Sequence, residues 1–162
     1  MIKILTTGGT IEGLDYVDES GITNSNVSIS DFLEAANVSI DYSIETAFKK
    51  DSRAIDDNDR NILVSKITSS PATKILITHG TFTMEETARY IGKLNLNKTI
   101  VLVGSFLLGS SANTDAPFNL GYAISSLQFL KQGVYVAMNG QIFDWNNVYK
   151  NLETNKFEHK DE

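Results

Sequence analysis

The sequence predicts an α/β fold in which a mostly parallel β-sheet is covered by helices on both faces. Short apolar runs typical of buried strands alternate along the chain with longer segments of helical spacing. Small polar residues and glycine follow several of these runs, as they do where strands end. The 162 residues contain no internal repeat, linker or low-complexity segment, so we expect one domain that is large enough to bury a core.

The N-terminal part is expected to form a strand, a helix and a second strand. Two glycines end the apolar run IKILTT (2–7), as is typical of a buried strand. ISDFLEAAN (29–37) has helical spacing, with Ser28 or Ser30 as its N-cap. VSIDYSIETAF (38–48) alternates apolar and polar residues and is rich in β-branched side chains, which favours a strand.

The middle of the chain continues this alternation. DDNDRNILVSKITSS (56–70) begins with acidic residues and ends with basic and small ones, the order that the helix dipole favours. KILITH (74–79) is expected to form a buried strand. Thr83 and Glu86 have the spacing of a capping box, which predicts a helix from there to about Lys93.

The C-terminal part is expected to contain three more strands and one helix. TIVLVG (99–104) is an apolar strand, and a loop rich in Gly, Ser and Asn follows over 105–115. PFNLGYAISSLQFLK (117–131) reads as a helix that a proline opens. GVYVAMNG (133–140) and QIFDW (141–145) resemble a hairpin with an Asn-Gly turn.

Composition excludes several classes of function. The net charge of −6 and the lack of a Lys/Arg cluster argue against a nucleic-acid partner. The chain has no cysteine, and its histidines, His79 and His159, are far apart, so we expect no disulfide, no metal site and no cofactor. The N-terminal apolar run is too short for a signal peptide and no run is long enough to span a membrane, which favours the cytoplasm.

Candidate site residues follow three strands, where ligands bind in open α/β sheets. In TTGGT (6–10), the Thr10 hydroxyl could attack a carbonyl, although a simple strand-exit turn explains this segment equally well. In HGTFT (79–83), Thr81 is expected to project into the cleft beside backbone N–H groups at a helix N-terminus. We interpret His79 as a hydrogen-bonded structural residue.

Taken together, these segments resemble the bacterial L-asparaginases. The resemblance spans residues 1–150 in the family's order and rests on TGGTI (7–11), HGTFTMEET (79–87), DAPFN (115–119), VYVAMNG (134–140) and the spacing of Asp144 and Lys150. It implies a three-layer, Rossmann-like or flavodoxin-like sheet over 1–150, followed by a polar tail at 151–162 that is expected to fray. The second, C-terminal domain of most family members has no counterpart, so a homodimer is expected to close the site differently.

The resemblance also implies roles for individual residues. The family hydrolyses a small side-chain amide through an acyl-enzyme, and Thr10 matches its nucleophile. Thr81 and Lys150 match the second threonine and the lysine that works with it. Ser52 matches a serine that binds the substrate α-carboxylate. The remaining expected substrate contacts are Gly9, Gly80 and Phe82.

Two departures from the family pattern predict a changed substrate. Phe82 stands where the family has an aspartate that binds the substrate α-ammonium and contacts the lysine, and loss of one partner of a buried ion pair costs about 3–5 kcal/mol. Within the 12–28 loop, interpreted as a lid or an ordinary surface loop, Ile22 aligns with the family tyrosine, and Tyr16 is the only tyrosine nearby. Without a neighbouring carboxylate, a buried Lys150 is expected to have a lowered pKa and to act as a base.

Three hypotheses remain open. The first is an asparaginase-type amidase whose substrate lacks a free α-amino group, such as an acylated or deaminated analogue. The second is a catalytically impaired relative that binds a small acidic ligand as a sensor or regulatory subunit. The third is an unrelated use of the scaffold, because a fold does not fix a function.

Overall fold

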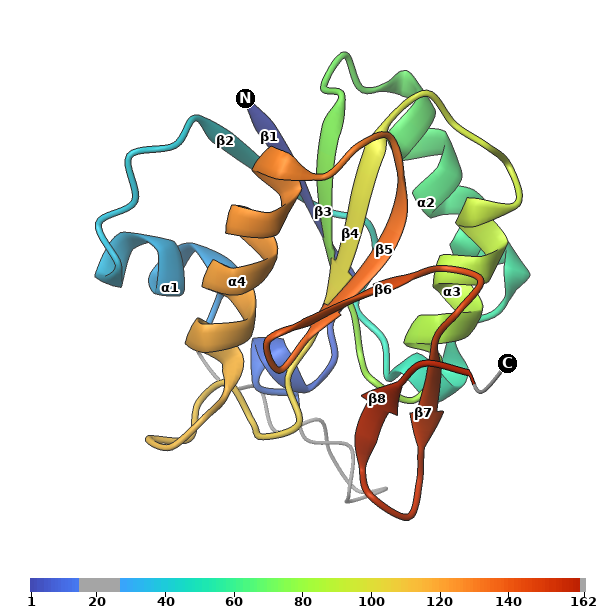
Figure 1. Cartoon of the computed structure of the whole chain (residues 1–162). Coiled ribbons are helices and arrows are strands. Elements are labelled where there is room, and N and C mark those ends of the chain that lie inside the picture. Colours follow the sequence, from blue (N-terminus) through green and yellow to red (C-terminus); the bar gives the residue numbers. More distant parts are fainter. Residues whose placement is uncertain (15–26, 161–162) are drawn as a thin grey trace.

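The computed structural model describes residues 1–14 and 27–160, which form an α/β fold around a six-stranded sheet (Figure 1). The strands follow the order β2-β1-β3-β4-β5-β6 across the sheet. The first five are parallel and β6 pairs antiparallel with β5, so the predicted mostly parallel sheet is confirmed. Their bounds are Ile2–Thr6 (β1), Tyr42–Thr46 (β2), Lys74–Thr78 (β3), Thr99–Val103 (β4), Gly133–Met138 (β5) and Gln141–Asp144 (β6).

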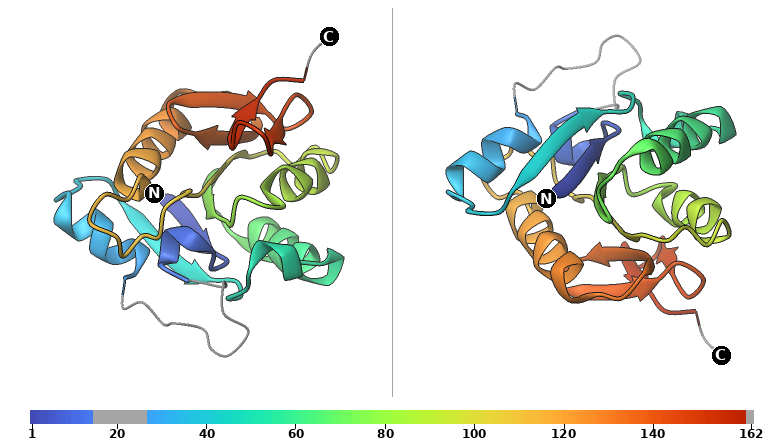
Figure 2. Two further views of the ribbon diagram at one scale, coloured as in Figure 1. Left: turned by 90° about the horizontal axis from the view of Figure 1, so that it is seen from below. Right: turned by 90° about the horizontal axis from the view of Figure 1, so that it is seen from above.

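Helices cover both faces of this sheet, as predicted. Two helices lie on one side and two on the other when the molecule is viewed along the strands (Figure 2). The first pair is α1 (Ile29–Ala35) and α4 (Ala116–Phe129), and the second is α2 (Asp57–Ser69) and α3 (Met84–Gly92). The fold therefore has three layers, with the sheet in the middle.

The core consists of two apolar layers, one on each side of the sheet. Alternate residues of β3 supply them: Ile75 and Ile77 pack with the α2 and α3 side chains, whereas Leu76 packs with those of α1 and α4. All three are fully buried. A strand with both faces covered needs no polar alternation, which explains why β3 and β4 read as continuous apolar runs.

The edge strand β2 is shorter than its sequence pattern predicts. A strand was expected over 38–48, but the ladder with β1 runs from Tyr42 to Thr46. Among the described residues, β1 is the only neighbour of β2 in the sheet, and the first paired residue of β1, Ile2, lies opposite Tyr42. The Asp41 carbonyl still accepts the Ile2 N–H at 2.8 Å, but residues 38–40 have no strand beside them among the described residues, despite their alternation.

The capping box expected at the start of α3 is wrong. Thr83 occupies the N-cap position but makes no side-chain cap, because its hydroxyl donates to the Ser52 carbonyl at 2.6 Å. Glu86 instead accepts a hydrogen bond from Arg60 at 3.1 Å. Capping boxes do begin α1, where Ser28 is the N-cap, and α2.

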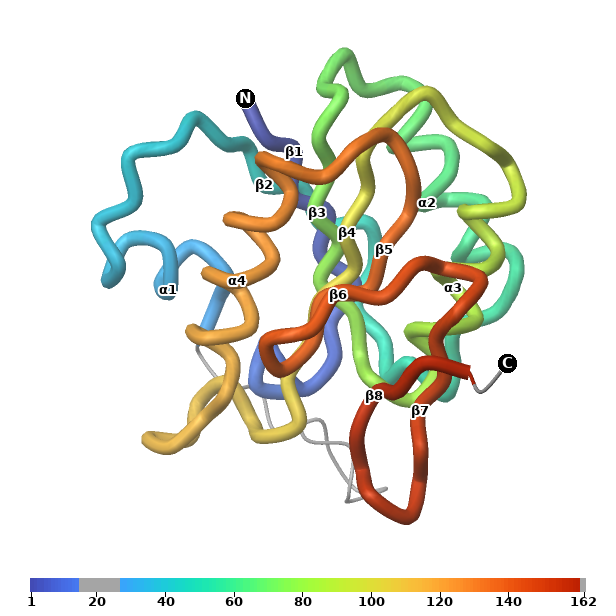
Figure 3. The backbone as a smooth tube through the Cα atoms, viewed as in Figure 1, coloured from blue at the N-terminus to red at the C-terminus, as the bar shows by residue number. Residues whose placement is uncertain are grey.

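The C-terminal segment is ordered where fraying was expected. Strands β7 (Tyr149–Asn151) and β8 (Lys156–Glu158) form an antiparallel hairpin outside the main sheet. Phe157 in β8 is buried and its ring centroid lies 6.0 Å from that of Phe106, which anchors the hairpin to the loop after β4. The carboxyl ends of β1, β3 and β4 and this hairpin lie at the same end of the molecule (Figure 3).

Candidate active site

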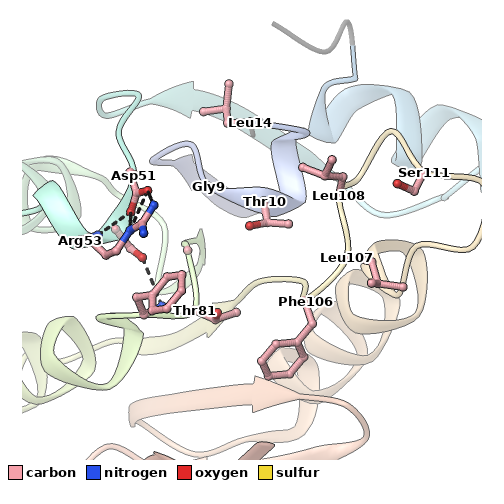
Figure 4. Close-up of a pocket in the computed structure, with 13 residues that line it drawn as sticks. Gly9, Thr10, Leu14, Asp51, Arg53, Thr81, Phe106, Leu107, Leu108 and Ser111 are labelled. Atoms are coloured by element: carbon pink, nitrogen blue, oxygen red, sulfur yellow. Dashed lines mark hydrogen bonds and ion pairs between the residues drawn. The ribbon is translucent and has the colours of Figure 1, made fainter. Parts of the chain in front are cut away.

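A cavity of about 360 Å³ lies at the carboxyl ends of the parallel strands, where α/β sheets bind ligands (Figure 4). Loops that follow β1, β2, β3 and β4 form its walls. The lining residues are Gly9, Thr10, Leu14, Asp51, Ser52, Arg53, Gly80, Thr81, Phe82, Phe106, Leu107, Leu108 and Ser111. Six of the seven residues expected at the site are among them, and the seventh, Lys150, contacts one of them.

Three of these loops meet at glycines. Gly9 has a φ of 82°, and a Cβ atom on it would lie 2.7 Å from the Gly80 nitrogen. A Cβ atom on Gly80 would lie 2.6 Å from the Ser52 hydroxyl oxygen. Side chains at these positions would force the loops apart, so glycine is required for the backbones to approach this closely. This contact brings Thr10 and Thr81, each next to one of the glycines, to a common cavity.

Backbone hydrogen bonds hold Thr10 in place. Thr10 lies in a short 3₁₀ turn, Thr10–Glu12, directly after the β1 exit. Its carbonyl accepts the Gly109 N–H at 2.9 Å, which links this turn to the loop after β4. The Glu12 carboxylate accepts the Gly8 N–H at 2.6 Å, and burial raises the pKa of Glu12. This contact between Glu12 and the Gly8 backbone was not predicted from the sequence.

Lys150 is joined directly to Thr81. Its Nζ lies 2.9 Å from the Thr81 hydroxyl oxygen, and its backbone N–H donates to a Glu85 carboxylate oxygen at 2.6 Å. Among the described residues, no carboxylate forms an ion pair with this Nζ. Burial lowers the pKa of Lys150, in the expected direction.

Two aromatic rings take the place of a carboxylate beside the lysine. The Lys150 Nζ lies 4.2 Å from the centroid of the Phe82 ring and 5.3 Å from that of Phe106. Ring faces attract an ammonium group, so they oppose the effect of burial. A carboxylate at this position would favour the charged form of the lysine more strongly than the rings do.

His79 is a structural residue in this geometry, as the sequence interpretation proposed. It is fully buried, its Nδ1–H donates to the Gly80 carbonyl at 2.7 Å, and its Nε2 accepts from the Thr87 hydroxyl at 2.9 Å. Burial lowers its pKa to about 4, and the nearby Arg60 charge acts in the same direction. The ring is therefore neutral at physiological pH and fixes the loop that carries Thr81.

Two further residues shape the cavity without having been predicted to do so. Arg53 is paired with the Asp51 carboxylate through its Nε at 3.0 Å and also through Nη2, and its Cζ lies 4.9 Å from the Phe82 ring centroid. Asp115 accepts the backbone N–H groups of Phe106 at 3.1 Å and Leu107 at 3.0 Å, which sets the position of the opposite wall. The helical spacing of Asp115 and Asn119 was a visible signal, whereas Arg53 resembles any surface arginine.

The expected lid lies mostly outside the described residues. Residues 15–26 of the 12–28 loop, which include Tyr16 and Ile22, lie outside the described residues. Within residues 1–14 and 27–160, no helix is long and apolar enough to cross a membrane, and no group of three or more His, Asp or Glu side chains is placed to hold a metal ion.

The fold and the cavity define an α/β protein with two threonine hydroxyls and a lysine at the carboxyl edge of its sheet. The chain belongs to the asparaginase family, since the family model described as "Asparaginase, N-terminal" matches residues 1–159. This result confirms the resemblance seen in the sequence.

Individual relatives agree with this assignment. The chain is 32% identical over 167 residues to L-asparaginase 2 of Escherichia coli (strain K12), covering 94% of this chain and 47% of that protein. It is 33% identical over 175 residues to the glutaminase-asparaginase of Acinetobacter glutaminasificans, covering 96% and 52%. The crystal structure of a probable cytoplasmic L-asparaginase from Campylobacter jejuni superposes with a TM-score of 0.80 at 30% identity, covering 98% and 52%. The chain spans about half the length of the curated relatives it matches.

Proposed function

We propose that this protein is an asparaginase-type amidohydrolase that hydrolyses the side-chain amide of a small, linear substrate and releases ammonia. One observation carries the proposal: the Lys150 Nζ lies 2.9 Å from the Thr81 hydroxyl, at a cavity that Thr10 also lines. A hydroxyl is a weak nucleophile until a base takes its proton. A lysine with a lowered pKa and no ion-pair partner among the described residues supplies that base.

In the proposed reaction, the Thr10 hydroxyl oxygen attacks the amide carbon, and its proton passes through the Thr81 hydroxyl to Lys150. The amide nitrogen takes this proton as its bond to carbon breaks, so that ammonia leaves and an ester remains on Thr10. Water then attacks the ester, the same pair accepts and returns a proton, and the acid is released with Thr10 restored.

Phe82 supports a substrate that lacks a free α-ammonium group. The Phe82 ring has the Lys150 ammonium and the Arg53 guanidinium over it, at 4.2 Å and 4.9 Å from its centroid. Among the described residues that line the cavity, the one carboxylate is that of Asp51, and it is paired with Arg53. An α-ammonium would therefore meet the Arg53 cation, a second cation whenever Lys150 is protonated, and no free carboxylate of the described residues, whereas an uncharged group meets no such repulsion.

A direct test measures ammonia release from L-asparagine, L-glutamine, succinamic acid and N-acetyl-L-asparagine. The Thr10→Ala variant serves as the blank. Release that disappears in this variant supports the threonine mechanism, and the preferred amide identifies what Phe82 selects. Equal release from the native protein and from Thr10→Ala would contradict the mechanism.

A second candidate is a catalytically impaired relative that binds a small acidic ligand as a sensor or regulatory subunit. In the part of the chain that the structure describes, no free carboxylate lines the cavity and Arg53 is exposed there, which favours anion binding without requiring turnover. Saturable thermal stabilisation by aspartate or a related acid, without ammonia release from any of the four amides, would favour this second function.

We also infer a homodimer in the cytoplasm as the working state. Phe82 and Leu107 line the cavity and are 54% and 44% exposed, and a second subunit would cover these apolar groups. Light scattering after gel filtration tests the subunit count, and a monomer at micromolar concentration would contradict it.

A further inference from the structure

The cavity has a distinct arrangement of charge and apolar surface beside its threonines. We propose that its substrate is an N-acylated ω-amide of an acidic amino acid: the Arg53 guanidinium binds the α-carboxylate, and the acyl group lies against an apolar wall of Phe82, Phe106 and Leu107. This inference rests on the proposed function and names the substrate class. It makes Arg53 a specificity-determining residue.

The charges around the cavity favour a substrate without an ammonium group. Of the described residues that line the cavity, Arg53 and Asp51 are the only charged ones, and they are paired with each other. The Lys150 Nζ adds a cation behind Phe82 when it is protonated. Arg53 and Asp51 offset each other, so the described lining offers no free carboxylate for an α-ammonium, whereas the exposed edge of Arg53 can still meet an anion. This arrangement favours an anionic substrate over a zwitterion, and more so when Lys150 is protonated. Acylation of the α-nitrogen removes the ammonium charge and leaves the carboxylate.

Two contacts orient the Arg53 guanidinium at the cavity. Asp51 occupies the Nε and Nη2 edge of the guanidinium, and the Phe82 ring lies 4.9 Å from its Cζ. These two contacts hold the planar group in one orientation and leave Nη1 without a partner among the described residues. The Arg53 side chain is 56% exposed, so a ligand can reach it. A guanidinium fixed in this way is suited to bind a carboxylate.

Ser52 adds a neutral donor beside Arg53. Its hydroxyl oxygen accepts the Phe82 N–H at 3.2 Å, which leaves the hydroxyl hydrogen to donate to a ligand. Ser52 lines the cavity and is 2% exposed. A carboxylate between Ser52 and Arg53 would therefore receive one hydrogen bond from each, and the substrate amide would extend toward the threonines.

The apolar wall of the cavity is suited to contact an acyl group. Five apolar side chains line the cavity, namely Leu14, Phe82, Phe106, Leu107 and Leu108. The volume of about 360 Å³ lies in the range of pockets that hold ligands larger than one amino acid. Asparagine has no apolar group to cover this wall, whereas an acyl chain on the α-nitrogen would bury part of it.

Kinetics on matched substrates tests the proposal. We expect N-acetyl-L-asparagine to have a kcat/KM at least about tenfold above that of L-asparagine, and N-hexanoyl-L-asparagine to have a lower KM than the acetyl compound. Arg53→Gln should raise the KM for N-acetyl-L-asparagine by about tenfold or more with a smaller change in kcat. Lys131→Gln removes one positive charge from an exposed position just after the end of α4 and should change neither constant.

Binding provides a readout that does not require turnover. Calorimetry with N-acetyl-L-aspartate, the product anion, is made on Thr10→Ala with and without Arg53→Gln, after circular dichroism has verified that both are folded. Binding that Arg53→Gln weakens supports the recognition step even if no amide is hydrolysed, in which case only the proposed function fails. Hydrolysis of L-asparagine in preference to both acyl compounds, or equal effects of Arg53→Gln and Lys131→Gln, would overturn the inference and leave the proposed function intact.

Discussion

The inner side of the cavity and its outer wall are built differently. On the inner side, Ser52, His79 and Thr81 are 2%, 0% and 6% exposed, and hydrogen bonds or glycine contacts fix the loops that carry them. On the outer wall, Phe82 and Leu107 are 54% and 44% exposed. The loops that carry Thr81 and Ser52 are therefore fixed by the core, whereas the exposed apolar side chains proposed to contact the acyl group depend little on it.

The largest effect is expected when the proposed nucleophile on the inner side of the cavity is removed. Thr10→Ala should reduce ammonia release by about a thousandfold or more, because no other proposed group forms the acyl bond. Ser111→Ala removes a hydroxyl from the outer wall and should change the rate less than about threefold. Steady-state assays check both, with melting temperatures as a control for folding. Comparable losses in the two variants would contradict the distinction between the sides.

His79 predicts a pH-dependent stability of the inner side. Its pKa is about 4 when folded, whereas the unfolded value is about 6.5, so the unfolded chain takes up its proton first as the pH falls. The free energy of unfolding should therefore decrease between pH 6.5 and pH 4, by up to about 3 kcal/mol.

Urea denaturation of the native protein and of His79→Asn at pH 7.5 and 4.5 measures how much His79 contributes to this decrease in the free energy of unfolding. The asparagine amide can still donate to Gly80 but does not titrate, and other titrating groups, Glu12 included, are common to both proteins. The variant should lose less stability than the native protein over this pH range. Equal losses in the two would show that His79 does not cause the decrease.

A pair of glycine substitutions tests the backbone contact. Gly80→Ala places a Cβ 2.6 Å from the Ser52 hydroxyl oxygen and should lower the free energy of unfolding by about 1–3 kcal/mol. A Cβ on Gly121, in the middle of α4, meets nothing within 4 Å, so Gly121→Ala should raise stability by up to about 1 kcal/mol. Urea denaturation of both variants checks the opposite signs.

A substitution in the outer wall tests the role of Phe82. Phe82→Asp adds a carboxylate near Lys150 and should raise the kcat/KM for L-asparagine by at least about tenfold. The same carboxylate should raise the pKa of Lys150, so the acid limb of the rate profile should move to higher pH. Phe82→Leu serves as the control and should show neither the gain with L-asparagine nor the shift of the acid limb. A marginal gain with asparagine would contradict the explanation given for Phe82.

Much of the fold was predictable because apolar runs and glycine-rich exits are local signals. The β7–β8 hairpin was missed because its segment is polar, and its anchor, Phe157, acquires a partner only when Phe106 is brought beside it. The capping box at Thr83 failed for a similar reason. The Thr83 hydroxyl donates to the Ser52 carbonyl, which lies 31 residues earlier in the chain. A pattern of neighbouring residues does not reveal such a contact.

The candidate site was predictable only in part. From the residues alone, TTGGT was equally consistent with a simple turn, and the resemblance to a family supplied Ser52 and Lys150. Arg53 was not predicted, because its relation to the cavity arises from Asp51 and Phe82, which hold it in place. Residues that act through tertiary contacts of this kind have no local pattern to identify them.

The close approach of Gly9 and Gly80 has a consequence for evolution and engineering. A Cβ on Gly9 would meet the Gly80 backbone and a Cβ on Gly80 would meet Ser52, so a side chain at either position requires a compensating change in the facing loop. The positions facing the open side are under no such constraint. A combinatorial library restricted to Arg53, Phe82 and Leu107 should therefore sample new amide substrates while most of its members still fold.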